Sequence, residues 1–272
     1  MTKKIHFISG LPRSGSTLLS GILNQNPKFH AGMSSPVASL INGCLEQMGA
    51  GGEFYSFFDE TKRKKIFKAL VDVYYEDNDK EVIFDTNRIW TARLHQLVEI
   101  YDDFKVVCLV RNPAWIMDSF EKIYRKNPFD YSKMFSANNR ITVYSRCESL
   151  LNGVVGLSLT ALKEAFYGEY SDRLLLVDYD LLTKFPEKTL KLIYDFTDTE
   201  YFNHDFNNVE YSHDEFDYTL GVKGLHTVQR KVEFKERRSI LPPDLFEKYS
   251  EMAFWRDTAG TAASVIAPKD KK

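Results

Sequence analysis

The sequence has few cysteines, no long uninterrupted apolar run and almost no net charge. Its three cysteines, Cys44, Cys108 and Cys147, share no disulfide or metal-site spacing, so we expect a reducing, cytoplasmic compartment and no bound metal. The most apolar region, residues 150–166, is interrupted by amide and charged side chains and predicts a buried helix, not a membrane span. A strand pattern begins at Ile5, so we expect no signal peptide. The formal net charge of −2 provides no general attraction for nucleic acid.

Residues 5–27 combine a short apolar run, a glycine-containing loop and a helical pattern. The spacing Gly10-x-x-x-x-Gly15-Ser16-Thr17 is that of a P-loop, in which glycines allow tight turns and backbone N–H groups bind phosphate. Ser16 stands where the usual pattern has Lys, which argues against ordinary ATP or GTP chemistry. Arg13 is the only cation within the loop. The sequence therefore predicts an anion site formed by Arg13, Ser14, Gly15, Ser16 and Thr17.

Strand patterns at 5–8, 81–85, 105–110 and 173–177 alternate with helical patterns. This alternation predicts an α/β fold, with a parallel sheet flanked by helices. We expect residues 1–260 to form a single domain, with a loop at 29–36 and one long helical region at 138–166, and residues 261–272 to form a flexible tail. Ligands of such sheets bind at the C-terminal ends of the strands. That edge would collect Arg13, Asp85, Arg88, Arg111 and Tyr179.

Three motifs resemble those of sulfotransferases that use 3′-phosphoadenosine 5′-phosphosulfate (PAPS), and are closer to the tyrosylprotein sulfotransferase group than to the cytosolic small-molecule group. The loop Gly10–Thr17 resembles the family's site for the 5′-phosphosulfate. Val110-Arg111-Asn112-Pro113, with Ser119 further along, resembles its 3′-phosphate site, and Val177-Asp178-Tyr179 resembles the segment whose Tyr contacts adenine. Arg230 and Lys231 resemble the C-terminal cofactor loop. The resemblance implies a P-loop NTPase-like sulfotransferase fold, with PAPS as donor and 3′-phosphoadenosine 5′-phosphate (PAP) as product.

The resemblance also implies transfer of a sulfuryl group to a hydroxyl of an acceptor, which the sequence does not identify. Arg13 is expected to stabilise the charge on the leaving oxygen, with Arg88 as a second candidate. The family's catalytic Glu and its Lys and His pair have no counterparts in 32–36 or 85–88. Asp85 is therefore the predicted general base, with His30 and His226 as alternatives. A partial match to a dimerisation motif at 223–233 leaves undecided whether the protein forms a homodimer.

Two other classes of function stay open at this point. The chain could be a P-loop NTPase or kinase, because Asp85 ends an apolar strand as a Mg²⁺-binding carboxylate does. It could also be a non-catalytic nucleotide-binding protein that keeps the fold without the base. The missing P-loop Lys counts against the first class. Tight PAP binding without turnover on many acceptors would favour the second.

Overall fold

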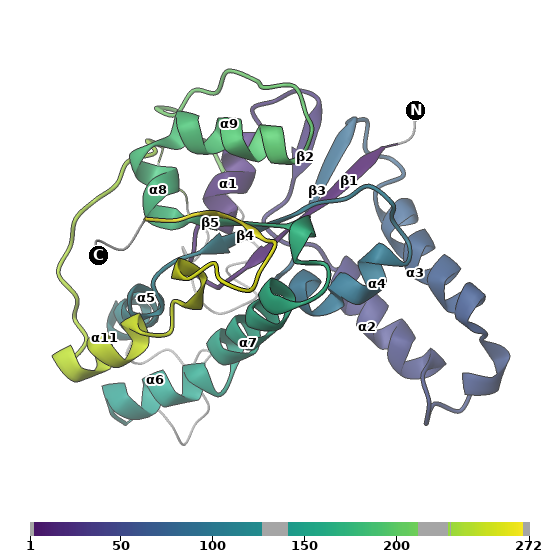
Figure 1. Ribbon diagram of the computed structural model, residues 1–272, viewed down its shortest axis with the longest axis horizontal. Coiled ribbons are helices and arrows are strands. Elements are labelled where there is room, and N and C mark those ends of the chain that lie inside the picture. Colours follow the sequence, from purple (N-terminus) through teal and green to yellow (C-terminus); the bar gives the residue numbers. More distant parts are fainter. Residues whose placement is uncertain (1–2, 127–140, 212–227, 229, 269–272) are drawn as a thin grey trace.

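The computed structural model describes residues 3–126, 141–211, 228 and 230–268. Within these ranges, six strands form one parallel sheet in the order β2-β3-β1-β4-β5-β6 (Figure 1). The strands are β1 (Lys4–Gly10), β2 (Phe29–Ala31), β3 (Val82–Thr86), β4 (Val106–Val110), β5 (Leu174–Asp178) and β6 (Ser264–Ile266). The predicted α/β fold with a parallel sheet is confirmed.

Helices cover both faces of this sheet (Figure 1). Those on one face are α1 (Ser16–Leu23), α8 (Tyr179–Lys184) and α9 (Pro186–Phe196). Those on the other face are α2 (Val37–Met48), α3 (Glu60–Tyr74), α4 (Leu94–Val98), α5 (Pro113–Lys126), α6 (Val143–Leu151), α7 (Val154–Tyr167) and α11 (Pro243–Ser250). Short 3₁₀ helices are η1 (Tyr55–Phe57), η2 (Arg88–Arg93), η4 (Ser171–Arg173) and η5 (Phe254–Arg256).

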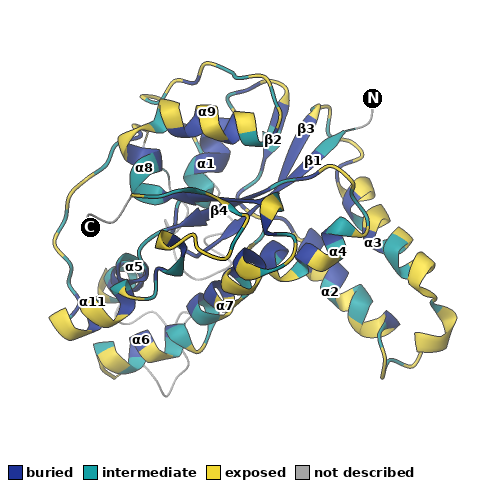
Figure 2. Ribbon diagram, viewed as in Figure 1, coloured by how far each residue is buried: buried dark blue, intermediate teal, exposed yellow. Residues whose placement is uncertain are grey.

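The central strand β1 separates two apolar cores. Ile5 and Phe7 face the core beneath α2–α7 and α11, whereas Ile8 faces the core beneath α1, α8 and α9. This follows from the two-residue period of a strand, which sends successive side chains to opposite faces. Figure 2 shows buried residues in the central strands and exposed residues along the outer sides of α3 and α9. Burial on both faces explains why these strands are continuous apolar runs.

Three parts of the chain differ from the sequence expectation. Residues 29–31 form β2 inside the segment expected to be a loop, and Ser264–Ile266 form β6, which pairs with β5 inside the expected tail. Both strands have only three residues, too few to produce a recognisable pattern. The predicted long helical region is divided into α6 and α7, because Gly153 has a non-helical backbone (φ −122°, ψ −127°).

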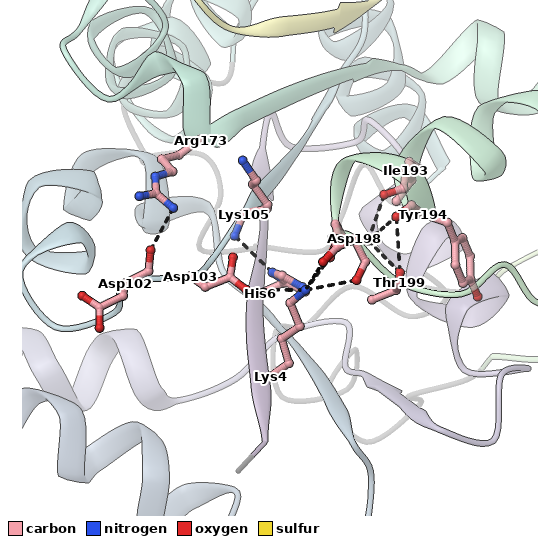
Figure 3. Close-up of polar contacts among 11 residues, drawn as sticks. Lys4, His6, Asp102, Asp103, Lys105, Arg173, Ile193, Tyr194, Asp198 and Thr199 are labelled. Atoms are coloured by element: carbon pink, nitrogen blue, oxygen red, sulfur yellow. Dashed lines mark hydrogen bonds and ion pairs between the residues drawn. The ribbon is translucent and has the colours of Figure 1, made fainter.

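The N-terminal end of the sheet is held together by polar contacts (Figure 3). Lys4 donates to the carbonyls of Thr197 (3.0 Å) and Asp198 (3.1 Å), and its ammonium lies 3.5 Å from the Asp103 carboxylate. The backbone N–H of Lys105 donates to Nδ1 of His6 at 3.1 Å. Burial is the main reason that the pKa of His6 is lowered to about 4, so this imidazole is neutral at pH 7. These contacts give the N-terminal end a structural role.

The C-terminal end of the sheet is arranged for binding. The chain passes from β1 to β2 and β3 on one side and then crosses to β4 and β5 on the other. Such a switch in strand order opens a crevice beyond the carboxyl ends of the strands, here between β1 and β4. No helix of the described chain is both long enough and apolar enough to cross a membrane.

Candidate active site

The loop between β1 and α1 has the backbone geometry of an anion cradle. Gly10 and Gly15 have φ values of 108° and 96°, and Arg13 between them has a φ of 60°. A Cβ at Gly10 would lie 2.2 Å from the carbonyl oxygen of Leu109, so only glycine fits between β1 and β4. No side chain caps the start of α1, and its first turn has no acidic residue. Its free N–H groups and positive dipole end therefore favour an anion.

Arg13 and Ser119 meet across this cradle. The Nε of Arg13 donates to the Oγ of Ser119 at 3.2 Å, although 106 positions separate the two residues. Ser119 lies on α5, which begins directly after β4 and so reaches the same edge of the sheet as the loop. A guanidinium and a hydroxyl are thus placed side by side at the mouth of the P-loop.

Arg111, Tyr179 and Gly15 form a stacked group on the other side of the loop. The Arg111 guanidinium lies 4.2 Å from the centroid of the Tyr179 ring. That ring packs on Gly15, where an added Cβ would lie 2.7 Å from Tyr179 Cδ2. Desolvation by burial lowers the pKa of Arg111, and its buried Nε has no hydrogen-bond partner within the described chain. A buried N–H of this kind favours a bound anion, which would supply the missing acceptor.

These groups line one cavity of about 990 Å³. The charged residues of its described lining are mostly cationic: Arg13, Arg88, Arg111, Lys231, Lys235 and Arg237, against the single carboxylate Glu233. Gly15, Ser16, Thr17, Ser119 and Tyr179 also line it. A cavity of this size accommodates a nucleotide together with a small second molecule. The excess of cations favours a ligand with several negative charges.

Arg237 and Lys235 are cavity residues that the sequence analysis missed. Asp118, buried on α5, forms an ion pair with Arg237 and accepts hydrogen bonds from Ser239 Oγ (3.1 Å) and the Ile240 N–H (2.7 Å). The Arg237 guanidinium also stacks on Trp115, 4.6 Å from the ring centroid. The basic run 235–238 was a possible signal, but only the fold brings it beside α5.

Two predicted cofactor residues do not present their side chains to the cavity. Arg230 is exposed outside the lining, and its guanidinium lies 3.6 Å from the Glu210 carboxylate, so Arg237 is the better-placed cation. Ser14 is fully buried, with its Oγ 3.4 Å from the carbonyl of Pro12. Lys231, the neighbour of Arg230, does line the cavity.

The position of Asp85 does not suit the predicted general base. Its side chain is fully buried and is not part of the cavity lining. Tyr75 Oη donates to Oδ2 at 2.6 Å, and Trp90 Nε1 donates to Oδ1 at 2.7 Å. Of the alternatives, His30 is half-buried outside the lining, and His226 lies outside the described residues, as does the start of the partial dimerisation motif. Arg88, by contrast, is exposed within the cavity.

Comparison with known proteins agrees with this geometry. The sequence model of the sulfotransferase family matches residues 6–203. A search of curated proteins finds no match. The structure is similar to a sulfotransferase domain from the curacin biosynthetic pathway, with 18% identity, 92% of each chain covered and a TM-score of 0.52. It is also similar to a sulfotransferase from Alicyclobacillus acidocaldarius, with 14% identity, 81% of this chain and 90% of that chain covered, and a TM-score of 0.51.

At these identities the solved structures establish the fold. The family match covers well over half of the chain, including the P-loop, β4, the start of α5 and Tyr179. It therefore includes every motif on which the sequence resemblance was based, apart from the C-terminal cations. The chain belongs to the sulfotransferase family.

Proposed function

We propose that the protein transfers a sulfuryl group from PAPS to a hydroxyl of an acceptor. The observation that carries this proposal is that two features line one cationic cavity: a P-loop without its Lys, and Arg111, whose Nε has no partner among the described residues. The P-loop lacks the cation that would match a γ-phosphate. Arg111 provides a second anion site across the cavity, which a nucleotide with a 3′-phosphate would occupy.

The residues of the cavity divide into two groups under this proposal. Ser16, Thr17 and the loop N–H groups would hold the 5′-phosphosulfate, because they form the start of α1. Arg111 and Ser119 would hold the 3′-phosphate, with Arg237 nearby, and Tyr179 would pack against the adenine. PAPS, when bound, supplies the activated sulfuryl group. Arg13 and Arg88 stabilise negative charge as it develops beside the P-loop.

Proton removal from the acceptor is not assigned to Asp85. Among the described lining residues, Glu233 is the only carboxylate, and it is paired with Lys235 at 2.9 Å and Lys231 at 3.5 Å. The hydrogen bond from Lys235 is the main reason that the pKa of Glu233 is lowered, which makes this carboxylate a weak base. The same burial that separates Asp85 from the cavity also removes it from the Mg²⁺-binding role that a kinase would require.

Thermal melts with PAP and with Mg-ATP at equal concentrations test this proposal. A ligand at about 100 times its dissociation constant adds about 2.7 kcal/mol to the free energy of unfolding. For a chain of this size, each kcal/mol raises the melting temperature by about 2–4 °C. We expect a clear shift with PAP and little with Mg-ATP. A larger shift with Mg-ATP would contradict the proposal, and PAP binding without sulfuryl transfer from PAPS to a broad panel of phenols and alcohols would indicate a non-catalytic protein.

A further inference from the structure

Asp85 occupies a buried junction between three segments of the chain. It lies near the end of β3, and its carboxylate is fully buried. Tyr75, just after α3, donates to one oxygen at 2.6 Å, and the indole of Trp90 in η2 donates to the other at 2.7 Å. Ser35, before α2, is a further neighbour, whose hydroxyl lowers the pKa of Asp85. A carboxylate that accepts hydrogen bonds from two other segments holds those segments against β3.

Two of these segments form a wall of the cavity. The N–H of Ser35 donates to the carbonyl of Thr86 at 3.1 Å, and Asn87 Nδ2 donates to the carbonyl of Ser35 at 3.3 Å. Ser34, Thr86 and Asn87 line the cavity. The contacts made by Asp85 therefore lie directly behind residues that face a ligand.

Arg88 is fixed in the same wall through its backbone. Ser9 Oγ donates to its carbonyl at 3.0 Å, and Asn87 caps η2 by accepting from the Ile89 N–H at 3.1 Å. Trp90, two residues further on, is fully buried, with its ring 4.7 Å from Phe7. Arg88 lines the cavity, and its side chain has no hydrogen bond or ion pair with the rest of the described chain. Its pKa is lowered by desolvation.

The strand order indicates which end of a ligand this wall would contact. β3 and β4 lie on opposite sides of β1. Under the proposed function, Arg111 and Ser119 hold the 3′-phosphate on the β4 side, and the P-loop after β1 holds the 5′ end. Arg88 on the β3 side then lies toward the sulfuryl group and the acceptor.

We propose that Asp85 is a positioning residue, which holds Arg88 and the segment 33–35 in place at the sulfuryl end of the cavity and does not itself touch substrate. The proposal rests on the proposed function. Burial raises the pKa of Asp85, whereas Ser35, Tyr75 and Trp90 act to lower it. The titratable groups that interact with Asp85 are His30, Tyr74, Tyr75 and Tyr101. None of these groups is itself part of the described cavity lining, so none could pass a proton from a ligand to Asp85.

The affinities of PAP and PAPS, measured by calorimetry, test this role without an acceptor. PAP has no sulfuryl group, so a change confined to the sulfuryl end alters PAPS binding alone. We expect Asp85→Asn and Tyr75→Phe each to weaken PAPS binding about 2- to 10-fold, the range for one ordinary hydrogen bond. Arg88→Met should weaken it about 10- to 100-fold, the range for hydrogen bonds to charged groups. PAP affinity should not change in any of the three variants.

Tyr101→Phe is the matched control. The Tyr101 ring, like that of Trp90, packs near Phe7, with 6.0 Å between the ring centroids of Tyr101 and Phe7. The buried hydroxyl of Tyr101 has no hydrogen-bond partner within the described chain. Its removal should leave the PAPS-to-PAP affinity ratio unchanged. If Asp85→Asn does not fold, Tyr75→Phe removes a single donor and gives the same test.

The possible results separate the positioning role from its alternatives. An unchanged affinity ratio in Asp85→Asn, with loss of the acidic limb of the pH–rate profile, would return the role of base to Asp85 and overturn the proposal. An equal loss for both ligands, or the same loss in Tyr101→Phe, would show general destabilisation and also overturn it. If the unmodified protein binds neither PAP nor PAPS, the proposed function fails first. If it binds both and the variants do not change the ratio, only the positioning role fails.

Discussion

Replacing Gly15 by alanine tests the stacked arrangement of the P-loop, Tyr179 and Arg111. Gly15 has a φ of 96°, and an added Cβ would lie 2.7 Å from Tyr179 Cδ2. The left-handed backbone alone costs an L-residue about 1–2 kcal/mol. Displacing the ring adds an overpacking cost of about 1–3 kcal/mol. Because the Tyr179 ring also lies beneath the Arg111 guanidinium, its displacement should shift Arg111 and weaken anion binding there.

Gly51 provides a matched control for the backbone cost. Its φ of 97° is nearly the same as that of Gly15, but a Cβ there would have no atom within 4 Å. Gly51→Ala should therefore lower the free energy of unfolding by about 1–2 kcal/mol, without any packing cost. Gly15→Ala should lower it further and should also weaken PAP binding, which Gly51→Ala should not affect.

Thermal melts and calorimetry with PAP measure the two effects separately. At about 2–4 °C for each kcal/mol, the difference between the variants should be several degrees. Equal losses of stability in the two variants would show that the Tyr179 ring moves aside at no cost. Unchanged PAP affinity in Gly15→Ala would refute the argument that the stacked group positions the anion site.

Two further predictions concern other contacts of the cavity. Arg111→Ala should weaken PAP binding about 10- to 100-fold, because it removes hydrogen bonds from a charged donor. The affinity for adenosine 5′-phosphate, which lacks the 3′-phosphate, should fall much less. An equal loss of affinity for both ligands in calorimetry would contradict the assignment of Arg111 to the 3′-phosphate. Asp118 gives a pH dependence: burial raises its pKa, but the Ile240 N–H and the Arg237 and Lys122 cations outweigh this and hold the pKa below the usual 3.8. The stabilisation is therefore fully present above the usual pKa and is lost as the pH falls below it. The difference between melts of Asp118→Asn and of the unmodified protein should thus be largest at pH 7 and decrease as the pH is lowered below about 4. A difference that does not depend on pH would contradict this account.

Local patterns in the sequence were sufficient for the four central strands of the sheet and for part of the cavity. The strands β1, β3, β4 and β5 are apolar runs because both of their faces are buried, so each can be recognised from its own residues. Parallel strands of one sheet end at the same edge, so the residues that follow them were expected to meet. The contact of Arg13 with Ser119 and that of Arg111 with Tyr179 follow this expectation.

The tertiary structure decided which polar residues face the cavity and which are buried behind it. Asp85 lies near the end of β3 and Arg88 just after it, and no local pattern distinguishes their surroundings. Asp85 is buried because Tyr75 and Trp90, on other elements, supply its hydrogen bonds. Arg237 enters the cavity and Arg230 does not, because Asp118 on α5 binds the chain at 237–240. Contacts of this kind depend on how whole elements pack against one another, which a sequence pattern of a few residues does not contain.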